Sequence, residues 1–262
     1  MTIRPPDASE RVQPQGRNGA PPVISIVVPA YNEGGNIRPL TEEILAAMAG
    51  GPSFEILFVD DCSDDGSPAE MEAMRAAHAE VRVVRHDRRS GKSAALFTAG
   101  RFVRGAWIQT LDGDLQNDPR DVPRAFAAAT GPQAPARLGI VAGQRTSRND
   151  GWFKWLQSRI ANGVRRALLQ DGTRDTGCGF KLIRAEAFRH IPYFDGMHRF
   201  LPALVRRAGF EVMALPVTDR PRGAGTSKYG FLGRLGAGIV DLFGVVWLIR
   251  RSKPPPGLSG DL

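Results

Sequence analysis

Short apolar runs rich in β-branched residues alternate with helix-forming segments along the first half of the chain. The runs occupy residues 23–28, 54–60, 81–86, 106–114 and 138–145, and segments with apolar residues at helical spacing follow the first three. Continuous apolar runs of this length are typical of strands buried on both faces of a parallel sheet. The alternation predicts an α/β fold, in which ligands bind beyond the carboxyl ends of the strands.

Polar clusters follow three of these runs, at residues 29–36, 60–67 and 112–118. All three fall at strand ends, so we expect them to line one crevice. In the third cluster Asp112 and Asp114 flank Gly113, and Gln116 follows. Carboxylate and amide oxygens at this spacing suit Mg²⁺ or Mn²⁺ and leave coordination positions for a phosphate. An isolated Asp-Gly-Asp is more often a polar turn, but a second acidic cluster at a nearby strand end favours a cation or a hydrogen-bond donor between them.

Composition limits the remaining possibilities. The 262 residues are 42% hydrophobic and 24% charged, as expected for a globular chain with a sizeable core. The two cysteines, Cys62 and Cys178, have no metal-ligand spacing, exclude a disulfide framework and are expected to be small buried thiols. The net charge of +8 indicates an anionic partner, which could be nucleic acid, a membrane surface or a phosphorylated substrate.

Two apparent phosphate-binding motifs are incomplete. The segment SGKSAA contains Gly91-Lys92-Ser93, but a Walker A loop requires glycine where His86 stands. The segment TGCGFKL lacks a third glycine and does not follow the first strand. Neither an ATPase nor a dinucleotide-dependent dehydrogenase is indicated.

The second half of the chain is less regular. The pattern predicts a long amphipathic helix over 151–169, a glycine-rich turn entering a strand or helix over 175–188, a helix over 199–210 and a strand over 211–217. A final apolar run, 235–249, is interrupted by Asp241 and followed by RRSK. It falls short of the ~20 residues that span a bilayer. The run is either a helix lying in the membrane interface or an ordinary core helix, and its sequence favours neither.

Four segments in order, VVPAYNEGGNI, FVDDCSDDGS, LDGDLQNDP and RPRGAGTSKYG, resemble the family-2 glycosyltransferases of GT-A fold. More narrowly they are similar to dolichol-phosphate mannosyltransferases and bacterial polyprenyl-phosphate relatives, from about residue 22 to 230. The resemblance implies a Rossmann-like, mostly parallel sheet flanked by helices, plus a C-terminal interfacial helix. The chain would then comprise a disordered N-terminal arm (1–21), a GT-A domain (22–230), an amphipathic membrane-associating segment (231–253) and a flexible tail (254–262).

The resemblance also implies roles for individual residues. The metal ligands would be Asp112, Asp114 and Gln116, and the catalytic set would be Asp112, Asp114, Arg222 and Lys228, of which the last two close over the diphosphate and the acceptor. The residues that would bind the nucleotide sugar are Pro29, Tyr31, Glu33, Val59, Asp61, Asp112, Gly113, Asp114, Arg145 and Arg159. One departure is Cys178 in DTGCGF, where relatives usually read Thr-Ser-Gly-Phe.

The implied activity is inverting transfer of a hexose from a GDP- or UDP-linked sugar to a dolichyl- or undecaprenyl-type polyprenyl phosphate. It would depend on Mg²⁺ or Mn²⁺ and take place at the cytoplasmic face of the membrane, against anionic lipid. A divalent cation and fixed Arg and Lys donors would stabilise the charge that develops on the departing nucleoside diphosphate.

A phosphate acceptor is already an anion and needs no strong general base. This agrees with the sequence contexts of His78, His86 and His190, where we expect no acidic partner nearby. His198 is expected to be packed or solvated rather than to contact the acceptor, and Asp175 is the only candidate base.

Three other functions are less consistent with the sequence. A family-2 glycosyltransferase acting on a soluble, polysaccharide or lipid-glycan acceptor in cell-envelope synthesis is the alternative, although the Q-x-x-R-W motif of processive synthases is missing: QSRIA lacks the tryptophan. Nucleic acid is not expected as a partner, because acidic strand ends would repel a phosphate backbone and only three tyrosines occur. A catalytically inactive nucleotide-sugar sensor fits poorly with the intact Asp112-Gly113-Asp114.

Overall fold

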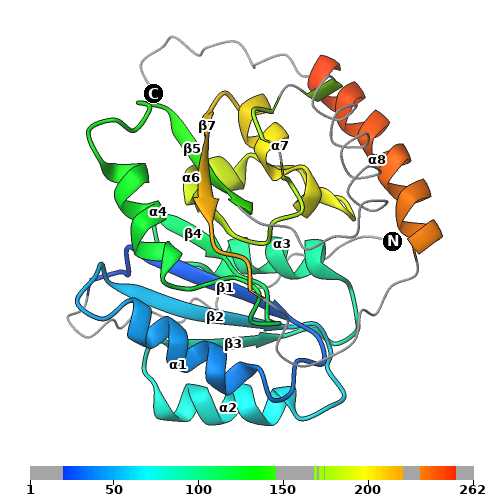
Figure 1. Cartoon of the computed structure of the whole chain (residues 1–262). Coiled ribbons are helices and arrows are strands. Elements are labelled where there is room, and N and C mark those ends of the chain that lie inside the picture. Colours follow the sequence, from blue (N-terminus) through cyan, green and yellow to red (C-terminus); the bar gives the residue numbers. More distant parts are fainter. Residues whose placement is uncertain (1–19, 146–167, 170, 174, 221–230, 252–262) are drawn as a thin grey trace, which may run out of the picture.

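The computed structural model describes residues 20–145, 168–169, 171–173, 175–220 and 231–251 (Figure 1). Several sequence predictions fall outside these ranges: nearly all of the N-terminal arm, most of the helix predicted over 151–169, and the tail. The predicted site residues Arg159, Arg222 and Lys228 also lie outside the described residues.

The described residues form a seven-stranded sheet in the order β3-β2-β1-β4-β6-β5-β7. The strands are β1 (Ile24–Ala30), β2 (Phe54–Asp60), β3 (Val81–Arg85), β4 (Trp107–Thr110), β5 (Leu138–Arg145), β6 (Lys181–Arg184) and β7 (Glu211–Val217). Strand β6 is antiparallel to both of its neighbours, β4 and β5, and every other pair is parallel. The predicted mostly parallel α/β sheet is confirmed.

Helices cover both faces of the sheet (Figure 1). They are α1 (Ile37–Ala47), α2 (Ser67–Ala77), α3 (Lys92–Phe102), α4 (Asp121–Thr130), α6 (Ala185–Arg189), α7 (Leu201–Arg207) and α8 (Phe231–Arg251), with a 3₁₀ turn, η1 (Met197–Arg199). Apolar side chains of α1, α2 and α4 share one buried cluster with Ile24, Ile26 and Val28 of β1. Those of α3, α6, α7 and α8 share a second cluster with Val27. Since successive side chains of a strand point to opposite faces, β1 contributes to both layers of the core.

Helix α4 was not predicted from the sequence. For the segment 175–188 the sequence predicts a strand or a helix, and the structure has one of each. Its glycine-rich turn enters β6, and α6 follows at once. The short strand β6 matters for the site, because its pairing with β4 sets Lys181 opposite Thr110.

Helix α8 packs against the second core through one side only. Val245 is buried, and Asp241 forms an ion pair with Arg199 of η1 at 3.0 Å. Val240, Phe243 and Trp247 are 71%, 64% and 62% exposed, and their spacing puts them on one helical stripe. No helix in the described ranges is long and apolar enough to cross a membrane. The helix therefore docks on the core and also presents an apolar stripe outward.

The buried carboxylate of Glu55 links neighbouring strands at their amino ends, opposite the ends that carry the polar clusters. Glu55 is 4% exposed and accepts hydrogen bonds from Ser25 Oγ (2.6 Å), Arg82 Nη1 (2.7 Å) and the amide of Arg104 (2.8 Å). Its loss would leave three donors without their acceptor, at a free-energy cost set by burial.

We therefore expect Glu55→Ala to lower the free energy of unfolding by about 2–3 kcal/mol in urea denaturation, somewhat less than for a fully buried pair because Arg82 retains solvent contact. The control is Glu72→Ala, which breaks the exposed Glu72–Arg75 pair (2.7 Å) and should cost less than about 0.5 kcal/mol. Equal effects of the two substitutions would show that the Glu55 network does not stabilise the sheet.

Candidate active site

The three polar clusters meet at the carboxyl ends of β1, β2 and β4. The amides of Asn32 and Glu33 donate to Ser63 Oγ (3.0 Å) and Ser67 Oγ (2.8 Å), which ties the first cluster to the second. A Cβ added at Gly113 would lie 3.2 Å from Cγ of Glu33, so the third cluster packs against the first. The three clusters therefore lie side by side, as predicted, because the three strands run parallel and end at the same edge of the sheet. That they line one ligand-binding crevice stays a prediction.

The carboxylates of the second cluster are held by protein donors. Asp61 accepts hydrogen bonds from the amides of Ser90 (2.8 Å) and Gly91 (2.7 Å) and lies 2.8 Å from Nδ1 of His86. The expectation that His86 has no acidic partner is therefore wrong: β3 lies beside β2 in the sheet and brings His86 to Asp61, 25 residues away in sequence. Asp61 anchors the loop that leads into α3, and its predicted contact with the nucleotide stays a prediction.

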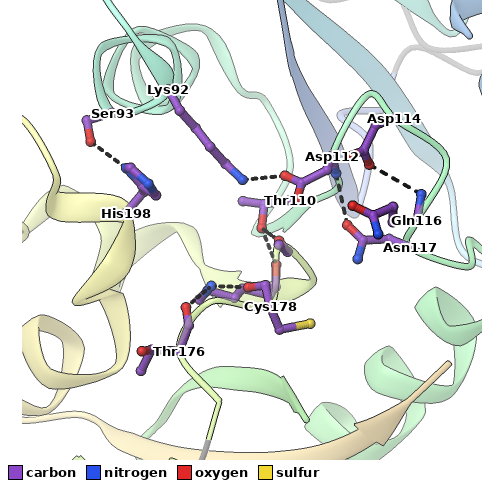
Figure 2. Close-up of polar contacts among 12 residues, drawn as sticks. Lys92, Ser93, Thr110, Asp112, Asp114, Gln116, Asn117, Thr176, Cys178 and His198 are labelled. Carbon is purple, nitrogen blue, oxygen red and sulfur yellow. Dashed lines mark hydrogen bonds and ion pairs between the residues drawn. The ribbon is translucent and has the colours of Figure 1, made fainter. Parts of the chain in front are cut away.

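Asp112 lies two residues after the end of β4, between Lys92 and the turn that holds Asp114 and Gln116 (Figure 2). Its amide donates to Asn117 Oδ1 (2.9 Å), and its carboxylate accepts a hydrogen bond from the ammonium of Lys92, the first residue of α3. Burial alone would raise the pKa of Asp112, but the Lys92 ammonium, helped by Lys181, holds that pKa below its usual value. Asp112 is thus a fixed negative charge at neutral pH.

Gly179 allows Asp112 to occupy this position. A Cβ at residue 179 would overlap the Asp112 carboxylate, so that side chain lies directly on the glycine backbone. The turn containing Gly179 is fixed from both sides. Thr110 Oγ1 donates to the Gly179 carbonyl (2.5 Å), and Lys181 Nζ donates to the carbonyls of Thr176 (3.2 Å) and Cys178.

Asp114 and Gln116 complete the predicted metal set. Asp114 is 8% exposed, and its Oδ1 accepts a hydrogen bond from the Gln116 amide (3.3 Å) across a turn in which Leu115 has φ +65°. The Gln116 side chain donates through Nε2 to the carbonyl of Arg220 (3.5 Å), which leaves Oε1 as its acceptor atom.

These oxygens fit Mg²⁺ or Mn²⁺ as an incomplete ligand set. Within the described part of the chain, no group of three or more His, Cys, Asp or Glu side chains is arranged to hold a metal ion. Two carboxylates and one amide oxygen leave several positions of a six-coordinate ion for other oxygens, such as phosphate. The chemistry of the donor set therefore suits an ion that binds together with a phosphorylated ligand.

Other predicted binding residues occupy varied positions. The Tyr31 ring lies under the guanidinium of Arg89, 4.1 Å from its centre, and Pro29 is the penultimate residue of β1. Val59 is fully buried in the second core cluster, so any contact with a ligand would come from its backbone.

Arg145 and Asp175 are paired with each other. Arg145 Nε and Nη2 donate to the two oxygens of Asp175 at 2.6 and 3.0 Å. Burial would lower the pKa of Arg145, but Asp175 outweighs this effect and raises it. A carboxylate that accepts two hydrogen bonds from a guanidinium is a weak base, so Asp175 is a poor candidate for a catalytic base.

Three polar residues of the site were not identified from the sequence: Lys92, Ser93 and Lys181. Lys181 is 4% exposed, and burial lowers its pKa to about 8. Ser93 Oγ lies 2.8 Å from Nδ1 of His198, whose pKa is lowered to about 3 by burial and by Lys92 and Lys181. His198 is therefore a neutral, packed side chain, as expected. For Lys92 and Ser93 the available signal is the segment SGKSAA, an incomplete phosphate-binding loop.

The two cysteines differ in exposure. Cys178 is buried, and burial raises the pKa of its thiol. Cys62 is only partly buried and has φ +63°, so the expectation of a buried thiol is confirmed for Cys178 alone.

Arg220, the first residue of the fourth family motif, is fixed beside Gln116 and Asn117. Arg220 donates through its amide to the Gln116 carbonyl (2.9 Å) and through Nη2 to Glu43 Oε2 (2.7 Å) and the Asn117 carbonyl (3.0 Å). Arg222 follows two residues later, outside the described residues. The segment that contains Arg222 and Lys228 therefore begins beside Gln116.

We expect Gly179→Ala to lower the free energy of unfolding by about 1–3 kcal/mol, because the added methyl group must displace the Asp112 carboxylate. Gly66→Ala is the matched control, since a Cβ there meets nothing within 4 Å, and it should stay within about 0.5 kcal/mol of the natural protein. Urea denaturation measures both. A Gly179→Ala protein as stable as the control would mean that the turn yields without strain.

Solved structures with similar folds contain a nucleotide sugar and Mn²⁺. The chain superposes on a mannosyltransferase from Pyrobaculum calidifontis in complex with GDP-Man and Mn²⁺, with TM-score 0.63 and 20% identity over 90% of this chain and 67% of that one. It also superposes on glucosyl-3-phosphoglycerate synthase from Mycobacterium tuberculosis in complex with Mn²⁺ and UDP-glucose, with TM-score 0.64 and 18% identity over 87% of this chain and 79% of that one. These similarities show the GT-A fold.

Sequence comparison narrows the relationship. The chain is 32% identical to dodecaprenyl-phosphate galacturonate synthase of Rhizobium johnstonii, over 91% of this chain and 71% of that protein. It is 30% identical to undecaprenyl-phosphate 4-deoxy-4-formamido-L-arabinose transferase of Edwardsiella ictaluri, over 80% of this chain but only 63% of that protein. Residues 25–192, which include β1 to β6 and the Asp112–Asp114 turn, match the model of glycosyl transferase family 2. The chain belongs to glycosyltransferase family 2 and is a glycosyltransferase.

Proposed function

We propose that this chain transfers a sugar from a nucleotide sugar to a polyprenyl phosphate at a membrane surface. The observation that carries the proposal is the oxygen set of Asp112, Asp114 and Gln116 just beyond β4, which would leave coordination positions for the oxygens of a phosphorylated ligand. Both curated relatives described above are named for transfer to, or synthesis on, a polyprenyl phosphate. The chain spans 71% and 63% of their lengths, so parts of those proteins have no counterpart in it.

The proposed donor site uses residues from each polar cluster. Asp112, Asp114 and Gln116 would hold Mg²⁺ or Mn²⁺, which supplies Lewis-acid stabilisation to the leaving nucleoside diphosphate when bound. Glu33, Tyr31 and Asp61 lie along the ends of β1 and β2 and would line the nucleotide pocket, with Pro29, Val59 and Gly113 beside them. We propose that four basic residues pair with phosphate charge: Arg145, Arg159, Arg222 and Lys228. Arg145 would do so while its guanidinium also stays paired with Asp175.

The state of the candidate bases supports an acceptor that is already anionic. Asp175 is held by Arg145, and His198 has a pKa of about 3 and accepts a proton poorly at neutral pH. A sugar or glycerol hydroxyl would need a base to remove its proton during attack. A phosphate monoester oxygen needs none. This observation favours the phosphate acceptor over a hydroxyl acceptor on a soluble or polysaccharide substrate.

Helix α8 supports action at a membrane. Its stripe of Val240, Phe243 and Trp247 is exposed, and Arg250 and Arg251 follow at the end of the helix. An amphipathic helix with aromatic and basic residues in this order suits the interface of a bilayer with anionic lipid. We propose that the stripe rests on the membrane that holds the acceptor, at its cytoplasmic face, and brings the crevice toward the lipid phosphate.

The direct test is a donor screen with purified protein, Mn²⁺ and undecaprenyl phosphate, against UDP- and GDP-linked hexoses and uronic acids, with mass-spectrometric detection of glycolipid. We expect product with at least one donor. Asp114→Asn should reduce the rate by ~10²-fold or more through loss of a charged ligand, while circular dichroism and the unfolding midpoint stay unchanged, and EDTA should abolish turnover. Full turnover in EDTA would exclude the metal. Transfer only to a soluble glycan or phosphorylated alcohol would favour the alternative acceptor.

The membrane role has its own test in flotation with liposomes containing phosphatidylglycerol. Replacing Phe243 and Trp247 by Ser should reduce the bound fraction by ~10-fold or more, because both side chains are exposed and their loss removes apolar area without disturbing the core. The control replaces Phe102 and Tyr193, two exposed aromatic residues outside α8, by Ser. Equal flotation of the two double variants would show that α8 does not provide the membrane contact.

A further inference from the structure

The protein itself engages both oxygens of the Asp112 carboxylate. Oδ1 accepts the hydrogen bond from the Lys92 ammonium, and Oδ2 is covered on one side by the backbone of Gly179. A divalent cation that binds Asp112 needs direct contact with one of these oxygens. An ion on Oδ1 would share that oxygen with the Lys92 ammonium, and the repulsion between the two positive charges favours displacement of Lys92.

Lys92 is able to move, whereas the second lysine at the site is not. The side chains of Lys92 and Asp112 are 33% and 30% exposed, so the pair faces the crevice and the four-carbon stem of Lys92 can swing. Lys181 is 4% exposed, and two backbone carbonyls hold its ammonium beneath the turn. One positive charge beside Asp112 is thus fixed and the other is exchangeable.

We propose that Lys92 is an internal counter-ion that competes with the divalent cation for Asp112, so that the ion binds well only together with the donor. The inference rests on the proposed function, because it assigns the metal to Asp112. Asp112 already has the ammonium groups of Lys92 and Lys181 nearby, so an ion that arrives alone competes with Lys92 and brings no negative charge to compensate. A nucleoside diphosphate brings negative charge of its own, with which the displaced ammonium can pair.

The decisive measurement is the affinity of the full chain for Mn²⁺ alone, followed by electron paramagnetic resonance after EDTA treatment and dialysis. Removing the competing ammonium in Lys92→Met should tighten Mn²⁺ binding by about tenfold. Lys92→Arg keeps the charge and should stay within about twofold of the natural protein. The matched control is Arg101→Met, which removes the same charge from the exposed end of the same helix, about 13 Å along its axis. Unchanged or weaker Mn²⁺ binding by Lys92→Met would overturn the proposal.

A second readout separates displacement of Lys92 from a general effect of charge. Mild amine acylation followed by mass spectrometry reports how accessible the Lys92 ammonium is, relative to the other lysines of the chain. Saturating Mn²⁺ should raise labelling of Lys92 severalfold if the ion takes its place on Asp112. Labelling that does not respond to Mn²⁺ would show that the pair persists and that no competition occurs.

Coupling to the donor is tested by repeating the Mn²⁺ titrations with UDP or GDP. The tenfold gap between the natural protein and Lys92→Met should shrink to about twofold, since the diphosphate gives Lys92 another partner. A gap that persists would refute the coupling. The outcome is independent of turnover: transfer activity combined with unchanged Mn²⁺ affinity would refute this inference alone, and competition without transfer from any donor would refute the proposed function alone.

Discussion

The antiparallel pairing of β4 with β6 is the contact on which the rest of the site depends. It joins the parallel set β3-β2-β1-β4 to the pair β5-β7, and its register sets Lys181 opposite Thr110. Through that register the turn at Gly179 comes to lie against Asp112, and Thr110 bonds the turn from the strand beneath. A slip of one residue would reverse the faces on which these side chains stand and remove the support of the carboxylate.

Charge in the crevice is balanced by local pairs rather than by the +8 of the whole chain. Three of the acidic groups have defined partners: backbone amides for Asp61, a lysine for Asp112 and an arginine for Asp175. The Lys92–Asp112 pair is partly exposed, and an exposed ion pair is weak and exchangeable, which suits a site that must admit a charged ligand. The buried ammonium of Lys181 is different, because burial opposes its charge and its location cannot be explained by stability alone.

The sequence predicted the strands better than the contacts between them. Strands β5 and β7 begin and end where the pattern indicated, since β-branched runs bounded by polar residues are a local signal. Helix α4 was not predicted because its sequence is rich in alanine and contains Pro123. Proline breaks a helix in its interior, but Pro123 lies in the first turn, where proline is tolerated. That the three polar clusters lie side by side could be predicted from strand order alone. The His86–Asp61 and Lys92–Asp112 pairs join residues 25 and 20 positions apart, and only the packing of α3 and β3 on the sheet reveals them.

The position of β6 also determines the order in which the chain can fold. Strand β5 is made before β6, yet among the described strands it pairs with β6 and the still later β7. During synthesis β4 and β5 therefore wait with open edges until residue 184 has emerged, and β5 must hold its place across a connection of 35 residues. Closing a connection of that length is slow, and unpaired edges invite association between chains. The nascent protein is thus most exposed to aggregation just before the step that completes both its sheet and its crevice.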